Sequence, residues 1–408
     1  MRTIVVGAGA VGLACAYALR KRGCDVVVVE QGKPGSGCSE GNAGWICPSH
    51  SAPLPAPGLT WDSLKWMLRS DSPLYIAPGA VPGMAPWLWR FWRSCNRHDF
   101  DRGFRALALL NRGTRSAFDG LHSEGVEFEL HRDGLLSVFR DERALAESLR
   151  LHSEHHIEGY APPTLLSRTQ VQRLEPSLSD VVVGGLLVGE EYHVRPETLI
   201  RGYVKRLSEV GVDVRCGITV IGPTPDGILT SAGQIEGDAV LVAAGAWSGK
   251  LLTAFGSRLP IQAAKGYSIT VPAARLPLGR PILLADARVA CTPFAGATRF
   301  AGTLELSGIN TALSRRRVAA IRKAIARYFR ARVDDGEGVE WVGMRPLAPD
   351  GLPLLGRITG PRNLFAATGH GMLGITLAPV TGEVMGDLIV HGRPSDLLSP
   401  FSPDRFAR

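Results

Sequence analysis

Residues 1–12 read Met-Arg-Thr-Ile-Val-Val-Gly-Ala-Gly-Ala-Val-Gly, an apolar strand that runs directly into a Gly-x-Gly-x-x-Gly pattern. Each glycine of this pattern has a mechanical task. Gly7 permits the tight turn, Gly9 lets a pyrophosphate approach the backbone, and Gly12 lets the following helix pack closely on the strand. The pattern therefore predicts a dinucleotide at the helix N-terminus, where unpaired N–H groups and the helix dipole favour an anion.

A second apolar strand, at residues 25–30, completes a β-α-β unit and ends in an acid, Glu30. This carboxylate lies roughly 20 residues beyond the last glycine, where such a group accepts hydrogen bonds from ribose hydroxyls. An acid at this position argues against a ribose 2′-phosphate, and so against NADP. It does not separate NAD from FAD, and a glycine-rich turn without a cofactor remains the structural alternative.

The composition narrows the functional class. The chain has 408 residues and a net charge of +8, but no basic run is longer than residues 315–317, so we expect no nucleic-acid partner. The seven cysteines form no C-x-x-C pair, and we expect neither a metal site nor a disulfide framework. No run of 18 apolar residues is present, and the N-terminus does not read as a signal peptide. A cytoplasmic protein is predicted.

The order of strands and helices predicts two interleaved domains. Strand patterns alternate with helix patterns at both ends of the chain, whereas short strands of antiparallel character follow Gly256. We expect helices at residues 101–124, 141–159, 196–210, 314–333 and 374–390, and strands at 134–139, 238–243, 261–271, 281–292 and 298–306. A discontinuous nucleotide-binding domain is assigned to 1–80, 150–255 and 340–408, and a substrate-binding domain to 81–149 and 256–339. FAD oxidoreductases interleave their domains in this way more often than NAD dehydrogenases do.

Further segments carry a resemblance to a known family. Residues 38–48 contain Asn42-Ala43-Gly44, a buried strand at 238–243 opens into Ala244-Gly245-Ala-Trp247, and residues 265–268 read Lys-Gly-Tyr-Ser. Residues 343–353 contain Gly-Met-Arg-Pro, and residues 369–374 read Gly-His-Gly-Met-Leu-Gly. In this order they resemble the D-amino-acid oxidase superfamily of flavoproteins, and within it the bacterial D-amino-acid dehydrogenases of small-subunit type, including D-hydroxyproline dehydrogenases.

The resemblance implies a fold and a cofactor. The fold class would be α/β plus α+β, with a Rossmann-like FAD-binding domain and an interleaved substrate domain on an antiparallel or mixed sheet. FAD would be bound non-covalently. The residues expected to contact it are Gly7, Ala8, Gly9, Ala10, Val11, Gly12, Glu30, Gln31, Ser39, Asn42, Ala43, Gly44, Val220, Ala244, Gly245, Trp247, Gly343, Gly369, Gly371, Met372, Leu373, Gly374 and Ile375.

The resemblance also implies the oxidation of a D-amino acid, or of a cyclic imino acid such as D-proline or D-hydroxyproline. Arg345 would hold the substrate carboxylate, because a guanidinium is a planar two-pronged donor; a structural ion pair is the alternative. Tyr267 could donate to the same carboxylate or be a packed tyrosine. Lys265 could lie near the flavin or be a paired lysine.

The segment around His370 is expected to act through its backbone. The N–H groups of residues 371–375 would face the flavin at a helix N-terminus, where they stabilise negative charge. His370 itself is not expected to be the general base. His50 is a weaker candidate for that role, and a polar loop residue is its alternative.

The electron acceptor and partners are less defined. A dehydrogenase of this kind would pass electrons to a quinone or another respiratory carrier. The aromatic run at residues 87–93 could contact the inner face of the cell membrane or pack on the substrate domain, and the basic helix at 314–333 could be a solvated face. The rival functions are a glycine or sarcosine oxidase that uses oxygen, and an FAD-binding subunit that needs a partner chain.

Overall fold

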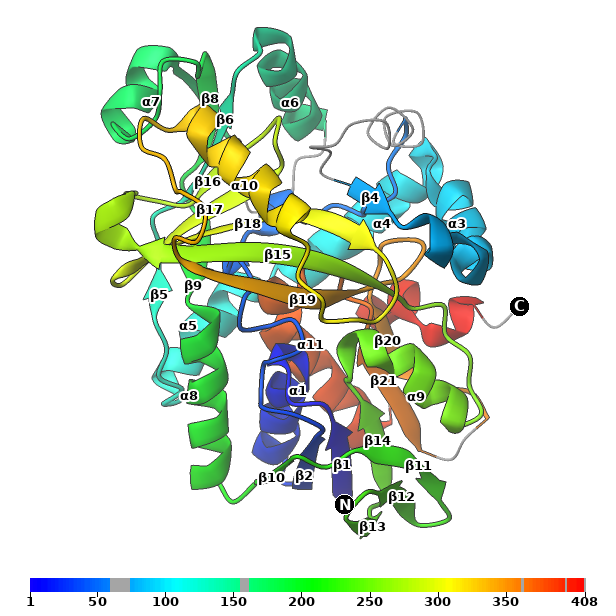
Figure 1. Ribbon diagram of the computed structural model, residues 1–408. Coiled ribbons are helices and arrows are strands. Elements are labelled where there is room, and N and C mark those ends of the chain that lie inside the picture. Colours follow the sequence, from blue (N-terminus) through cyan, green and yellow to red (C-terminus); the bar gives the residue numbers. More distant parts are fainter. Residues whose placement is uncertain (59–73, 155–160, 361–362, 393–394, 407–408) are drawn as a thin grey trace.

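The computed structural model describes residues 1–58, 74–154, 161–360, 363–392 and 395–406. Figure 1 shows two main sheets, one in the lower half of the view and one in the upper half. The lower sheet has six strands in the order β10-β2-β1-β14-β21-β20. Its strands are β1 (Arg2–Val6), β2 (Asp25–Glu30), β10 (Asp213–Cys216), β14 (Ala239–Val242), β20 (Leu354–Arg357) and β21 (Leu364–Thr368). All neighbours are parallel except β20 and β21.

Both faces of the six-stranded sheet are covered, which is why its inner strands β2, β1, β14 and β21 are largely apolar, whereas the edge strand β10 carries Asp213 and Arg215. On one face, Val5 and Val28 pack in the same core as α1 (Ala10–Lys21), α8 (Pro196–Glu209) and α11 (Gly374–His391). On the other face, Ile4 and Val27 pack against α9 (Ser248–Ala254) and a small sheet of β11 (Val220–Thr224), β12 (Gly227–Thr230) and β13 (Gly233–Glu236).

Helices α1 and α11 pack directly on each other because both carry small residues at the contact. A Cβ atom at Gly382 of α11 would lie 2.6 Å from the carbonyl oxygen of Ala14 in α1. This close approach brings the N-termini of the two helices to the same side of the sheet, where the parallel strands have their carboxyl ends. Ligands of such folds bind at that edge.

The upper sheet has nine strands in the order β19-β15-β18-β17-β16-β6-β8-β7, with β4 also paired to β18. They are β4 (Leu74–Ile76), β6 (Leu135–Phe139), β7 (Thr164–Ser167), β8 (Gly184–Val188), β15 (Gln262–Pro272), β16 (Ile282–Leu284), β17 (Val289–Phe294), β18 (Ala297–Leu306) and β19 (Val339–Leu347). Helix α10 (Arg315–Tyr328) covers one face through Val318, Ile321 and Ile325. The predicted pairing of a Rossmann-like sheet with a second, mixed sheet is confirmed.

The remaining elements surround the two sheets. A second small sheet joins β3 (Trp45–Ile46), β9 (Tyr192–Val194) and β5 (Leu130–His131). The other helices are α3 (Val81–Ser94), α4 (Arg97–Asn111), α5 (Thr114–Ser123), α6 (Glu142–Glu154) and α7 (Arg168–Leu174). Short 3-10 helices are η1 (Pro48–His50), η2 (Pro78–Ala80), η3 (Gly245–Trp247), η4 (Ala273–Arg275), η5 (Asp396–Phe401) and η6 (Pro403–Phe406).

Three predicted elements differ from the structure. The helix expected at 101–124 is two helices, α4 and α5, separated near Gly113. The strand expected at 281–292 is the hairpin of β16 and β17, because residues 285–288 form a turn in which Arg288 has a φ of 51°. Helix α10 ends at Tyr328, five residues before the predicted end. The end of the expected helix 141–159 lies partly outside the described residues.

Sheet membership also differs from the predicted division of the chain. Strands β7 and β8 fall within 150–255, yet they join the nine-stranded sheet because β8 pairs with β6. Strand β19 likewise falls almost wholly within 340–408 and pairs with β15. The chain therefore crosses between the two sheets more often than the predicted boundaries allow. Among the described helices, none is both long and apolar enough to cross a membrane.

Candidate active site

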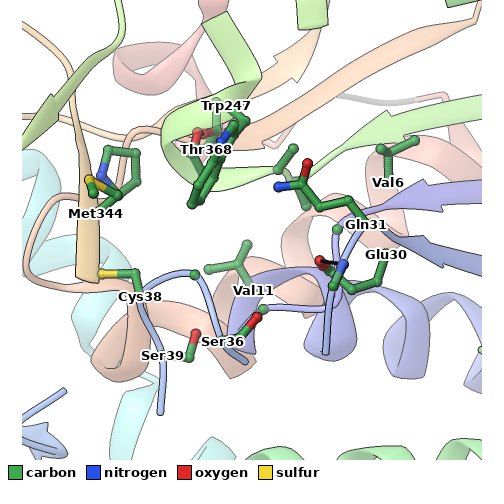
Figure 2. Close-up of a pocket in the computed structure, with 18 of the residues that line it drawn as sticks. Val6, Val11, Glu30, Gln31, Ser36, Cys38, Ser39, Trp247, Met344 and Thr368 are labelled. Atoms are coloured by element: carbon green, nitrogen blue, oxygen red, sulfur yellow. Dashed lines mark hydrogen bonds between the residues drawn. The ribbon is translucent and has the colours of Figure 1, made fainter. Parts of the chain in front are cut away.

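A cavity of about 620 Å³ lies where the six-stranded sheet, α1, α11 and strand β19 meet. Figure 2 shows Glu30 and Gln31 on one side of it, Cys38 and Met344 on the other, and Trp247 across from Val11. Sixteen of the sequence-predicted residues line this cavity. They are Gly7, Gly9, Ala10, Val11, Glu30, Gln31, Ser39, Asn42, Val220, Ala244, Gly245, Trp247, His370, Gly371, Gly374 and Ile375.

The glycine turn has the geometry that the sequence predicts. Gly7 has a φ of +111°, and a Cβ atom there would lie 2.5 Å from the carbonyl oxygen of Ala243. A Cβ at Gly12 would lie 1.9 Å from the Gly7 carbonyl oxygen, so the helix can approach the turn only without a side chain. Gly9 differs, because a Cβ there would be 3.5 Å from Ser39 Oγ, an ordinary contact. Gly9 therefore leaves room on the cavity side, whereas Gly12 serves the packing.

The N-terminus of α1 offers hydrogen-bond donors to an anion. The Ala10 N–H donates to Ser39 Oγ at 3.1 Å. The N–H groups of Val11 and Gly12 have no acceptor elsewhere in the described chain, as expected for the first turn of a helix. The room that Gly9 leaves on the cavity side and the orphaned donors together fit a pyrophosphate group.

Glu30 is held in place by the turn that it faces. Its Oε2 accepts from the Ala8 N–H at 2.9 Å and its Oε1 accepts from the Gly32 N–H at 2.8 Å. An ionised carboxylate has about four acceptor positions, so two remain for ribose hydroxyls. Ala8 itself is fully buried and lies behind the cavity wall.

The opposite end of the cavity is formed by the N-terminus of α11. Not all of the predicted N–H donors are available there. The Gly371 N–H donates to the Pro346 carbonyl at 2.8 Å, and the Leu373 N–H donates to the His370 carbonyl at 2.9 Å. The N–H groups of Gly374 and Ile375 have no acceptor in the described residues, and both residues line the cavity. The Met372 N–H also has no acceptor in the described residues, but Met372 does not line the cavity. The free donors that border the cavity are therefore those of Gly374 and Ile375.

His370 is a buried neutral side chain in the cavity wall. It is 4% exposed, and its Nε2 shares a hydrogen bond with Thr381 Oγ1 at 3.1 Å. Burial lowers the pKa of His370 to about 3. His50 lies away from this cavity, between Ser49 and Ser137, and burial followed by the neighbouring His152 lowers its pKa to about 3. Neither imidazole has the basicity of a general base at neutral pH.

Lys265 and Tyr267 do not reach the cavity, which corrects their expected placement at the substrate. Lys265 Nζ donates to Asn310 Oδ1 at 2.8 Å and pairs with Glu305 at 3.0 Å, and the Tyr267 hydroxyl donates to Glu305 Oε2 at 2.9 Å. Tyr267 packs in the core under α10. The register partners of the two residues on β19, Met344 and Val342, line the cavity, so both residues lie on that sheet face, but their polar ends turn to Glu305. The paired lysine and the packed tyrosine are thus the readings that fit the structure.

Arg345 lies on the other face of the same sheet. Its half-buried guanidinium covers Gly266, where a Cβ atom would be 2.1 Å from Arg345 Cζ. Arg345 Nη1 donates to the Thr303 carbonyl at 3.0 Å, and within the described residues the guanidinium pairs with no Asp or Glu. Burial lowers its pKa, and the nearby Cys38 opposes that effect. A desolvated guanidinium without a carboxylate partner is suited to an anionic ligand.

Arg345 is not itself in the cavity wall, but its neighbours on β19, Met344 and Pro346, are, and so is Cys38. The other predicted contacts outside the wall are Ala8, Gly12, Ala43, Gly44, Gly343, Gly369, Met372 and Leu373. Gly343 has a packing task, because a Cβ atom there would lie 1.9 Å from the Trp341 ring.

Several lining residues were not predicted. Ser36, Gly37 and Cys38 lie in the glycine- and serine-rich loop after Glu30, and that loop was the available signal. Ile218, Thr219 and Ile221, on either side of the predicted Val220, reach the cavity because β10 pairs with β2, a long-range pairing that no local pattern predicts. Lys250 and Thr311 also line it.

Comparisons with known proteins agree with this arrangement. Residues 2–388 match the family described as DAO, FAD dependent oxidoreductase. The chain is 33% identical to a D-amino acid dehydrogenase of Xanthobacter autotrophicus over 97% of each chain, and 32% identical to one of Rhizorhabdus wittichii over the full length of both. Among solved structures, glycine oxidase from Bacillus cereus has a TM-score of 0.75 at 22% identity, covering 97% of this chain and 99% of that one. L-proline dehydrogenase from P. horikoshii has a TM-score of 0.74 at 18% identity, covering 100% and 98%.

Proposed function

The chain belongs to the family of FAD dependent oxidoreductases, and from that premise we propose that it is a dehydrogenase of D-amino acids. The observation that carries the proposal is the full-length similarity, above 30% identity, to proteins named D-amino acid dehydrogenase. FAD is the cofactor of the family, and the cavity offers a glycine cradle and two helix N-termini for it. We include cyclic imino acids of the D-proline and D-hydroxyproline type among the substrates.

When bound, FAD supplies the acceptor for a hydride, which leaves the substrate α-carbon for flavin N5 and gives an imino acid that water hydrolyses. The chain contributes binding and alignment. The Val11 N–H group would hold the pyrophosphate, and Glu30 would hold the ribose. At the α11 end of the cavity, the Gly374 and Ile375 N–H groups would face the flavin and would stabilise negative charge on it.

Arg345 would hold the substrate carboxylate through two parallel N–H···O bonds. The support is its desolvation, the lack of an acidic partner among the described residues, and its electrostatic contact with Cys38 in the cavity wall. With the carboxylate fixed and the amine neutral, hydride transfer depends on alignment, with the reacting atoms about 3–3.5 Å apart. The low pKa values of His370 and His50 support a reaction without a histidine base.

We also propose that the electron acceptor is a quinone or another respiratory carrier, and that α3 touches the inner face of the membrane. Trp89 and Trp92 on this helix are 55% and 59% exposed, whereas Trp87 is buried. Arg93 lies over the Trp89 ring at 4.9 Å. Exposed tryptophans beside arginines are typical of helices at a bilayer surface.

Dye-coupled turnover of the purified chain tests the function. The panel contains D- and L-amino acids, glycine, sarcosine, and both hydroxyproline epimers. We expect turnover with D-amino or D-imino acids in the presence of a quinone analogue, with little peroxide. Peroxide release that matches turnover would support the oxidase instead, and a yellow chain that no compound in the panel reduces would support a subunit of a larger assembly.

A further inference from the structure

A cluster of two histidines and an aspartate lies outside the cavity, on the small sheet of β3, β9 and β5. His131 of β5 and His193 of β9 are register partners, and their rings stack with centroids 4.5 Å apart. Asp133 follows β5 by two residues. One ligand atom from each of the three side chains lies within 4.8 Å of the other two. The sequence did not suggest this cluster, because His193 is far along the chain from His131 and Asp133 and meets them only through strand pairing.

The hydrogen bonding of His193 leaves the lone pair of its buried Nδ1 without a partner. Its Nε2 lies 2.9 Å from the Pro293 carbonyl oxygen, which can only accept, so Nε2 carries the proton. Its Nδ1 is then an unprotonated acceptor. This atom is buried and has no hydrogen-bond partner, and His193 is 0% exposed. An unsatisfied buried nitrogen of this kind is costly unless something binds it.

His131 is oriented in the same way by an acid. Its Nε2 lies 2.8 Å from Glu129 Oε1, so the ring donates from that nitrogen to the carboxylate. Its Nδ1 faces Asp133, at 3.9 Å from Oδ2. A histidine that donates one N–H to a carboxylate or a carbonyl, and offers the other nitrogen, is the usual arrangement of a metal ligand. Both histidines of the cluster meet this condition.

We propose that His131, His193 and Asp133 bind a divalent transition-metal ion, with Zn²⁺ preferred. Two imidazoles and one carboxylate are a donor set for zinc and are too nitrogen-rich for magnesium or calcium. In a tetrahedral zinc site with bonds of about 2.0–2.1 Å, ligand atoms are roughly 3.4 Å apart. The two rings are stacked within 8° of parallel, so the His131 ring must rotate before both Nδ1 lone pairs can meet at one ion. The side chains of His131 and Asp133 are 35% and 46% exposed, so they can move onto an ion that His193 holds from the buried side.

The ion would have a structural role and is independent of the proposed redox function. His193 also pairs with Trp45 of β3, and Asn42, three residues before Trp45, lines the cofactor cavity. Metal binding would thus hold β5 against β9 and would stabilise β3, the strand that follows Asn42 of the cavity wall.

The test uses the FAD-loaded protein after removal of metal by dialysis against a chelator. Zn²⁺ is titrated by calorimetry, and bound zinc is counted by elemental analysis. Asp133→Asn and His131→Gln change partly exposed side chains, so these variants are expected to fold even where a His193 variant does not. Glu129→Gln tests the orienting acid. The matched control is His391→Gln, because His391 Nδ1 lies 3.7 Å from Asp387 Oδ1 in an exposed pair with no second histidine.

We expect one zinc per wild-type chain. Asp133→Asn and His131→Gln should each weaken binding at least 100-fold, Glu129→Gln should weaken it about 10-fold, and His391→Gln should leave it unchanged. Two results would overturn the proposal. One is a wild-type chain that retains no stoichiometric zinc. The other is zinc binding that survives both ligand substitutions at wild-type affinity.

Discussion

For the replacement of Arg345, the structure allows the expected fall in kcat/KM to be worked out. In the described chain its guanidinium has one hydrogen bond, to the Thr303 carbonyl, and no acidic partner, so its two-pronged edge is available for a substrate carboxylate. A hydrogen bond to a charged group contributes about 1.5–3 kcal/mol, and two contribute about 3–6 kcal/mol. Arg345→Ala should therefore lower kcat/KM by roughly 10²–10⁴-fold. Arg345→Lys keeps the charge but loses the fork, and should recover only part of this loss.

The assay is anaerobic reduction of the flavin by substrate, followed at several substrate concentrations. Arg345 does not line the cavity, so both variants should keep a full complement of FAD. Arg357→Ala is the control, because Arg357 is an exposed arginine whose Nη2 donates to Asn363 Oδ1 at the far end of β20. An Arg345→Ala enzyme that holds FAD and has a kcat/KM within about threefold of wild type would refute the carboxylate role.

Gly266→Ala tests the same contact without touching Arg345. The new Cβ would lie 2.1 Å from Arg345 Cζ, so the guanidinium must move. Because the displaced group is the end of a flexible side chain, the fold should tolerate the change. We expect a raised KM and a lowered kcat/KM with unchanged thermal stability. Wild-type kinetics in this variant would show that the position of the guanidinium does not matter.

Three further predictions follow from the cavity and its surroundings. Gly12→Ala should destabilise the fold by about 3 kcal/mol or more in chemical denaturation, because its Cβ meets a backbone carbonyl, whereas Gly9→Ala should fold and bind FAD more weakly; equal stabilities would contradict this division of tasks. His370 has a pKa of about 3 in the folded chain against 6.5 for an ordinary histidine, so the unfolded chain takes up its proton first and stability falls as the pH drops from 6.5 toward 3. Between pH 7 and pH 5, His370→Gln should lose about 2 kcal/mol less than wild type, and parallel denaturation curves for the two proteins would rule this out. Trp89→Ser combined with Trp92→Ser should abolish pelleting with anionic liposomes at low salt, while a wild-type protein that does not pellet would exclude membrane contact.

Local sequence signals were sufficient for the nucleotide-binding turn. The strand, the turn and the helix around Gly7 and Gly12 are neighbours in sequence. Each of these two glycines is needed because a Cβ atom there would clash with backbone atoms. The acid at the end of β2 follows from the same unit. Because the residues that fix this turn are close together in the sequence, its predicted geometry agrees with the structure.

Non-local pairing explains the parts that the sequence did not reveal. Strand β10 lies beside β2, and this pairing brings Ile218, Thr219 and Ile221 to the cavity from far along the chain. Residues 265–268 were recognised as a segment, but the face on which each side chain lies depends on the pairing of β15 with β18. That pairing is interrupted between Lys265 and Tyr267, next to Thr303 with its φ of 60°. The two-residue alternation of side chains along a strand does not show which face of the strand meets the ligand.

The most direct test of the central claim is a single-turnover reaction of the purified, FAD-loaded chain with paired D and L enantiomers in the absence of oxygen. The account predicts that the flavin absorbance bleaches rapidly and completely with at least one D-amino or D-imino acid, and not with its L enantiomer. Flavin that stays oxidised with every D compound, or that bleaches equally well with the L enantiomers, would contradict the account.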